Sequence, residues 1–112
     1  MSIESLRVQH CRPLKGKDAG LDDSAVAGYL KDLPGWTKAG DGGSIAKEFR
    51  FADYFHTMAF VNAVAWIAHV EDHHPDLDVG WGRCVVRYST HSVGGVSIND
   101  FICAAKVDAL DA

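Results

Sequence analysis

Residues 71–91 read EDHHPDLDVGWGRCVVRYSTH, and this stretch decides the fold. Pro75 ends a long helical pattern, because proline lacks the amide hydrogen of the helical bond and its ring clashes with the preceding turn. Residues 77–90 then predict two strands that meet at Gly80-Trp81-Gly82. The second strand alternates residue by residue. One face of it carries Cys84, Val86, Tyr88 and Thr90, and the other carries Arg83, Val85, Arg87 and Ser89.

Upstream of this stretch, the spacing of apolar residues predicts a long helix capped by Asp53. A hairpin is predicted before it, from residues 36–39 and 45–51 around a glycine-rich turn. A first helix is predicted over roughly residues 22–33, where Pro34-Gly35 stops it. On the long helix one face is expected to hold Phe55, Met58, Ala59, Asn62, Trp66, His69 and His73.

Downstream, Ser97 and Asp100 have the spacing of a capping box that opens a last helix. The order helix, two strands, helix, two strands, helix favours an α+β two-layer sandwich, a four-stranded antiparallel sheet with three helices packed on one face. Residues 1–20 are expected to form a loosely ordered N-terminal arm, and residues 21–112 a single domain. An open sheet face or bare edge strand invites self-association, so we expect a homodimer or homotetramer.

Composition excludes several classes of protein. The chain of 112 residues carries a net charge of −4, and no cluster of lysine and arginine is longer than two, so direct nucleic-acid binding is not expected. No apolar stretch is long enough to cross a membrane. The three cysteines are widely spaced, without a CxxC pair, and the N-terminus lacks the apolar core of a signal peptide. We therefore expect a soluble protein of the reducing cytoplasm.

The histidines suggest where chemistry could occur. His73 and His74 lie where the long helix ends, and His91 follows a strand, so three imidazoles from two elements could converge on one pocket suited to proton transfer. Taken by itself, the His73-His74 pair is more simply explained by an exposed helix end. A metal site is a further alternative, since His69 and His73 have i,i+4 spacing, but the pattern is not HExxH. From spacing alone, Asp100 is a helix cap.

The same residues form motifs known from one family. These motifs are Pro34-Gly35-Trp36, Phe49-Arg50-Phe51, Asp72-His73-His74-Pro75, Ser89-Thr90-His91 and Gly95-Val96-Ser97 with Asp100. With them the sequence resembles the pterin-4a-carbinolamine dehydratases from about Leu33 to Val107. The resemblance implies a hydro-lyase, a 4a-hydroxytetrahydrobiopterin dehydratase, that converts a 4a-hydroxytetrahydropterin to quinonoid dihydropterin and water. It further implies pterin recycling after an aromatic amino acid hydroxylase, with no metal or organic cofactor.

The resemblance also assigns roles to residues. His73 and His91 would transfer protons, and His74 would orient the pterin. The substrate-binding residues would be Trp36, Asp72, Pro75, Ser89, Thr90, Ser92 and Asp100. The chain departs from the animal pattern at His69 and Val93, where animal members have glutamate and cysteine. Animal members also serve as a dimerisation cofactor of a homeodomain transcription factor, so a protein-binding role without essential enzymatic activity is the alternative.

Overall fold

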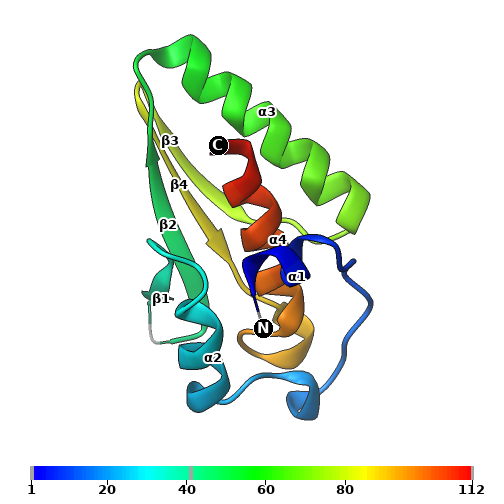
Figure 1. Ribbon diagram of the computed structural model, residues 1–112. Coiled ribbons are helices and arrows are strands. Elements are labelled where there is room, and N and C mark those ends of the chain that lie inside the picture. Colours follow the sequence, from blue (N-terminus) through cyan, green and yellow to red (C-terminus); the bar gives the residue numbers. More distant parts are fainter. Residues whose placement is uncertain (1, 41, 112) are drawn as a thin grey trace.

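The computed structural model describes residues 2–40 and 42–111. One antiparallel sheet has the strand order β1-β2-β4-β3, and helices cover one of its faces (Figure 1). The predicted α+β two-layer architecture is confirmed. The strands are β1 (Thr37–Ala39), β2 (Ser44–Arg50), β3 (Asp76–Gly80) and β4 (Arg83–Tyr88). The helices are α1 (Ile3–Arg7), α2 (Asp23–Leu30), α3 (Tyr54–Glu71) and α4 (Ile98–Asp108), with 3-10 turns η1 (Lys17–Ala19), η2 (His91–Val93) and η3 (Ala109–Asp111).

The core lies between the sheet and α4. Pairing of β2 with β4 sets Ile45 opposite Tyr88 and Phe49 opposite Cys84, and all four side chains are buried. The predicted alternation along β4 is confirmed, because side chains two residues apart on a strand point to the same face. Most of α4 is buried against them, as expected for a helix in the centre of a small domain.

The helix starts follow local capping chemistry. Asp22 accepts a hydrogen bond from the amide of Ala25, and Asp53 accepts one from the amide of His56. Ser97 and Asp100 form the predicted capping box at the start of α4. Each cap supplies an acceptor to an amide that has no partner within the helix, which explains why the sequence located these three starts correctly.

The face of α3 that the spacing singled out, with Phe55 and Trp66 on it, does not pack against the sheet. Phe55 and Trp66 are 75% and 66% exposed, whereas Thr57, Phe60 and Val64 face the interior. The Thr57 hydroxyl donates a hydrogen bond to the carbonyl of Trp81 in the β3–β4 turn, 2.8 Å away, and so fixes the rotation of the helix. Because α3 is apolar on nearly every side, its own periodicity does not specify which side the sheet covers.

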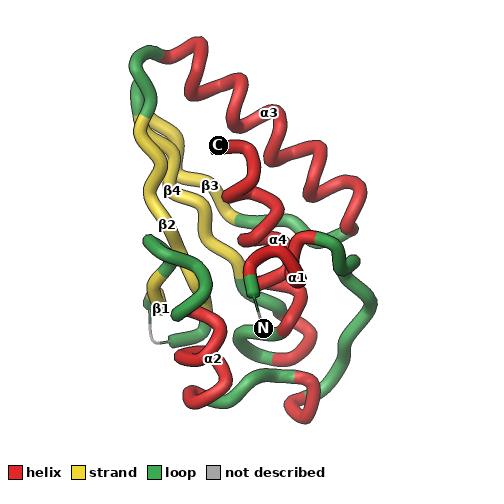
Figure 2. Tube along the Cα trace, viewed as in Figure 1, coloured by secondary structure: helices red, strands yellow, loops and turns green. Residues whose placement is uncertain are grey.

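Residues 2–20 are more ordered than the predicted loose arm. They contain α1 and η1, joined by a loop that Figure 2 shows running beside the lower end of α3. Leu6 is fully buried, and Arg7 Nε donates a hydrogen bond to the carbonyl of Ala105 in α4. A single buried leucine with polar contacts to the backbone leaves no periodic pattern in the sequence, so the packing of this segment could not be recognised.

Candidate active site

His73 reaches the site because α3 ends two residues before it. The helix stops at Glu71, and Asp72 adopts a left-handed conformation with φ 52° and ψ 43°. Asparagine and aspartate tolerate this region better than other residues with a side chain. The turn carries His73 off the helix and toward the start of α4, so His69 and His73 do not share a helix face as the metal alternative required.

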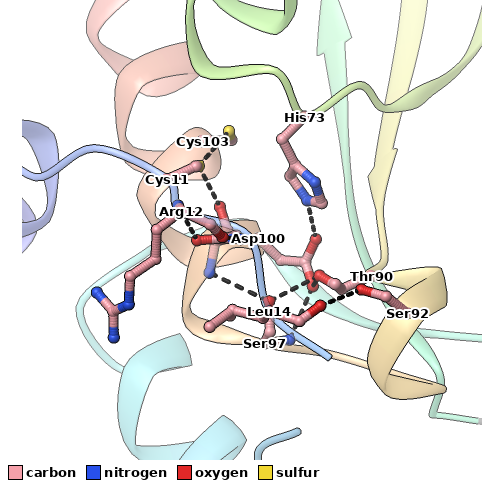
Figure 3. Close-up of polar contacts among 10 residues, drawn as sticks. Cys11, Arg12, Leu14, His73, Thr90, Ser92, Ser97, Asp100 and Cys103 are labelled. Carbon is pink, nitrogen blue, oxygen red and sulfur yellow. Dashed lines mark hydrogen bonds and ion pairs between the residues drawn. The ribbon is translucent and has the colours of Figure 1, made fainter. Parts of the chain in front are cut away.

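Asp100 joins three parts of the chain through its carboxylate, which is fully buried (Figure 3). Oδ1 lies 2.6 Å from Nε2 of His73. Oδ2 accepts hydrogen bonds from the Thr90 hydroxyl at 2.8 Å and from the amide of Ser97 at 2.9 Å. The Ser97 hydroxyl lies 2.7 Å from that of Thr90 and completes the network. The carboxylate thus binds the histidine and caps α4 at the same time.

The network assigns the tautomer of His73. An ionised carboxylate only accepts hydrogen bonds, so Nε2 of His73 carries the proton that it donates to Asp100. Nδ1 is then the ring nitrogen outside this network and is available to exchange a proton. The imidazole also stacks on Tyr88, with ring centroids 5.7 Å apart and planes at 14°. Burial raises the pKa of the Tyr88 phenol, which therefore stays neutral beside it.

A cavity of about 420 Å³ opens beside this pair, within the size range of small-molecule sites. The α3–β3 connection and the end of β4 supply its walls, so the three predicted histidines do converge from two elements. The residues that line it are Asp72, His73, His74, Asp76, Ser89, Thr90 and His91. Two carboxylates and three imidazoles in one small cavity suit the binding of a polar ligand and proton transfer to it.

Four of the predicted binding residues do not line this cavity. Trp36 is 3% exposed in the core, where its Nε1 donates to a carboxylate oxygen of Asp108 at 3.0 Å. The Ser92 hydroxyl donates to the carbonyl of Leu14, and Pro75 lies outside the lining. Asp100 lies behind His73 rather than in the cavity wall.

Sequence reasoning missed Asp76 in the cavity wall and Ser97 in the network behind it. Asp76 directly follows the motif Asp72-His73-His74-Pro75 at the start of β3, so its position in the sequence could have indicated a place in the cavity wall. Ser97 was recognised only as a cap. Within residues 2–40 and 42–111, no group of three or more histidine, cysteine, aspartate or glutamate side chains is arranged to hold a metal ion. No helix there is long and apolar enough to cross a membrane.

The family model described as "Pterin 4 alpha carbinolamine dehydratase" matches residues 19–110. The chain belongs to this family. A curated relative from Xanthomonas oryzae pv. oryzae, named "Putative pterin-4-alpha-carbinolamine dehydratase", is 59% identical over 105 residues, which cover 94% of this chain and 89% of the relative. A relative of the same name from Stenotrophomonas maltophilia is 58% identical over 100 residues, covering 89% and 86%.

Two solved structures related to the dehydratase family have the same fold. The transcriptional coactivator/pterin dehydratase from Brucella melitensis superposes with a TM-score of 0.80 at 31% identity, covering 83% of this chain and 99% of that one. A pterin dehydratase-like protein described as a RuBisCO assembly factor in the alpha-carboxysome gives 0.58 at 28% identity, covering 67% and 87%. The names of these two neighbours include both enzymatic and protein-binding roles.

Proposed function

We propose that the protein dehydrates a 4a-hydroxytetrahydropterin to quinonoid dihydropterin and water by histidine general acid/base catalysis. The observation that carries this proposal is the pair of His73 and buried Asp100 at the cavity that His74 and His91 also line. Membership of the dehydratase family supplies the substrate class.

The reaction needs one proton in and one proton out. The bond from C4a to the hydroxyl oxygen breaks, and that oxygen takes a proton to leave as water. The neighbouring ring nitrogen loses its proton as the carbon–nitrogen double bond forms. A histidine serves both steps near neutral pH, and general acid–base help of this kind is typically worth about 10²–10⁴-fold.

The geometry suggests a division of roles. Asp100 holds Nε2–H of His73, so Nδ1 would accept the proton from the ring nitrogen. His91 is exposed at the start of η2 on the other wall of the cavity, so it would protonate the leaving hydroxyl. Carboxylates accept hydrogen bonds from amide and amine donors, which a pterin ring presents along one edge. His74, Asp72 and Asp76 would hold the ring in the cavity.

The proposal extends to the role of the enzyme in the cell and to its assembly. The enzyme would recycle the pterin in the cytoplasm after an aromatic amino acid hydroxylase has used it, and it would work as a homodimer or homotetramer without a metal or organic cofactor. Size-exclusion chromatography with light scattering measures the assembly. Activity that survives dialysis against a chelator would support catalysis by the side chains alone.

The proposal is tested by adding the purified protein to a hydroxylase reaction that generates the 4a-hydroxytetrahydropterin in situ. The decay of the intermediate is followed by absorbance. We expect decay faster than in buffer and proportional to the protein concentration. Decay at the buffer rate over the whole range of concentrations would reject the proposal.

A binding role without catalysis is the second candidate. Two structural neighbours carry names of this kind, a coactivator and an assembly factor. The outer side of α3 also presents large apolar side chains, among them Phe55, Trp66 and Val70. An inactive protein that captures a helical dimerisation segment in a pull-down, and loses it in a Trp66→Ala variant, would favour this candidate.

A further inference from the structure

Residues 10–16, called here the N-terminal strap, lie before the residues that the family model matches. The strap connects α1 with η1 and passes the end of α3 and the start of α4 (Figure 1). Upstream of the strap, the end of α1 is held to α4, because Lys106 Nζ donates a hydrogen bond to the carbonyl of Arg7 at 2.6 Å. None of its residues lines the 420 Å³ cavity. Any effect of the strap on that cavity must therefore pass through other residues.

The first anchor of the strap is Glu71, the last residue of α3. Its side chain is 3% exposed. Oε1 accepts the amide hydrogen of Cys11 at 2.7 Å, and Oε2 lies 2.8 Å from Nδ1 of His10. Lys106 Nζ is 3.8 Å from the same carboxylate. Glu71 immediately precedes the left-handed turn that delivers His73, so the strap holds the point from which this turn departs.

The second anchor is Asn99, which precedes Asp100 in the first turn of α4 and is 5% exposed. Its Oδ1 accepts the amide hydrogen of Arg12 at 3.3 Å, and its Nδ2 donates to the carbonyl of Arg12 at 2.7 Å. Figure 3 shows Arg12 of the strap near Ser97 and Asp100. One side chain thus satisfies both backbone groups of a strap residue, a pairing that only an amide side chain provides.

The third anchor is Ser92 in η2, next to His91. Its carbonyl accepts the amide hydrogen of Gly16 at 2.9 Å, and its hydroxyl donates to the carbonyl of Leu14. The strap therefore touches each of the three segments that carry site residues. Glu71 stands two residues before His73, Asn99 directly before Asp100, and Ser92 directly after His91.

We propose that the N-terminal strap holds the catalytic segments in register, with Glu71 and Asn99 as positioning residues for His73 and Asp100. The inference rests on the proposed dehydratase function. Loss of an anchor frees the end of α3 or the start of α4 to shift, and a displacement of about 1 Å at a catalytic group can cost on the order of 10²-fold in rate. Glu71 directly precedes the segment of Asp72 and His74, which hold the substrate in the proposed function, so a shift at Glu71 lowers kcat and raises KM. A shift at Asn99 acts on Asp100 behind His73, so it lowers kcat while KM stays nearly constant.

The test compares two anchor variants, Asn99→Ala and Glu71→Gln, with a control variant, Asn62→Ala. Asn62 is exposed on the outer side of α3. Steady-state dehydration gives kcat and KM for each protein, and thermal unfolding shows that each is folded at the assay temperature. We expect kcat to fall about tenfold or more for Asn99→Ala and about threefold for Glu71→Gln. KM should stay within about twofold of wild type for Asn99→Ala and rise for Glu71→Gln. Asn62→Ala should match wild type.

A second measurement needs no substrate. NMR follows the proton on Nε2 of His73, the nitrogen that lies 2.6 Å from Oδ1 of Asp100. We expect its resonance to shift or broaden in both anchor variants and to stay unchanged in Asn62→Ala. This result would stand even if the wild type had no dehydratase activity, which separates the two proposals. The inference is overturned if the folded variants keep both the kcat and the His73 resonance of wild type. If Asn99→Ala does not fold, Glu71→Gln alone decides by the same criterion.

Discussion

His73 Nε2 and Asp100 Oδ1 lie 2.6 Å apart although 27 positions separate the two residues in the sequence. The other oxygen of the same carboxylate caps α4 through the amide of Ser97. The orientation of the proposed base is thereby tied to the start of the central helix. This arrangement makes the site rigid, because Asp100 cannot turn away from His73 without giving up its hydrogen bonds to Ser97, the N-cap of α4, and to Thr90, which follows β4.

The Asp100→Asn variant tests this double role. The asparagine amide has nearly the same shape as the carboxylate, but one of its two polar atoms is a donor. In one orientation this donor faces Nε2–H of His73, and in the other it faces the Thr90 hydroxyl and the amide of Ser97. We expect kcat to fall by about 10²-fold or more, and the free energy of unfolding to fall by about 1–3 kcal/mol. Dehydration kinetics and urea unfolding measure the two effects.

Asp108→Asn is the matched control, because the Asp108 side chain is only 9% exposed and its carboxylate contacts Trp36 and Lys47 outside the cavity. It should lower stability and leave kcat unchanged. Equal losses of kcat in the two variants would show that the effect of Asp100 comes from destabilisation alone.

The Trp36→Phe variant addresses a residue that the family resemblance assigned to the substrate. In the structure its indole packs against Phe49 and Tyr88 and donates to Asp108. We expect the loss of this hydrogen bond to cost about 1 kcal/mol in the free energy of unfolding, with KM for the pterin unchanged. A raised KM in a variant of unaltered stability would return Trp36 to the binding site.

Sequence reasoning succeeded where the signal is local. The caps at Asp22, Asp53 and Ser97 each involve residues three positions apart or fewer, and the alternation along β4 needs only the pleat of one strand. It failed for the rotation of α3, because the helix is apolar on both its buried and its exposed sides. The hydrogen bond of Thr57 to Trp81, which fixes that rotation, joins residues 24 positions apart.

The site was predicted in part for the same reason. The three histidines of the motifs, His73, His74 and His91, line one cavity, and their roles stay predictions. Spacing alone made Asp100 a cap, and the family resemblance added a pocket role. The structure shows one carboxylate with an oxygen for each task. The anchors Glu71 and Asn99 could not be found, because their partners in the strap are 60 and 87 positions away.

The acid stability of the protein should depend on Glu71. Burial raises the pKa of this carboxyl, but hydrogen bonds from the Cys11 amide and His10, with the charge of Lys106, outweigh burial and hold the pKa below its ordinary value of 4.5. The folded state therefore binds this proton less readily than the unfolded state. The stabilisation is fully present above pH 4.5 and is lost as the pH falls below it through the pKa of the folded protein.

Urea unfolding at neutral and acidic pH measures this linkage. Wild type should lose more stability than Glu71→Gln between pH 5 and pH 3. Glu4→Gln, at an exposed position in α1, should behave like wild type. Identical acid curves for wild type and Glu71→Gln would contradict the assignment.

Mild oxidation should join the strap to α4. Sγ of Cys11 and Sγ of Cys103 are 3.5 Å apart, and a small approach brings them to the bond length of about 2.05 Å. Oxidised glutathione would take two electrons and two protons from the thiols and leave as two reduced molecules. Closing so long a loop should raise the free energy of unfolding by about 2–4 kcal/mol.

Peptide mapping without reductant identifies the cross-link, and thermal unfolding before and after reduction gives its effect. Cys11→Ser should show neither change. A cross-link that involves Cys84, which is buried on β4, would mean that the strap does not rest where the structure places it.

The most direct measurement is the rate of dehydration of a 4a-hydroxytetrahydropterin, generated in situ, by wild type and by His73→Ala and His91→Ala, each shown to be folded. His56→Ala is the control, because His56 pairs with Asp53 at the far end of α3. We expect wild type and the control to accelerate the reaction and each site variant to lose about 10²–10⁴-fold. Site variants as fast as wild type, or a wild type no faster than buffer, would contradict it.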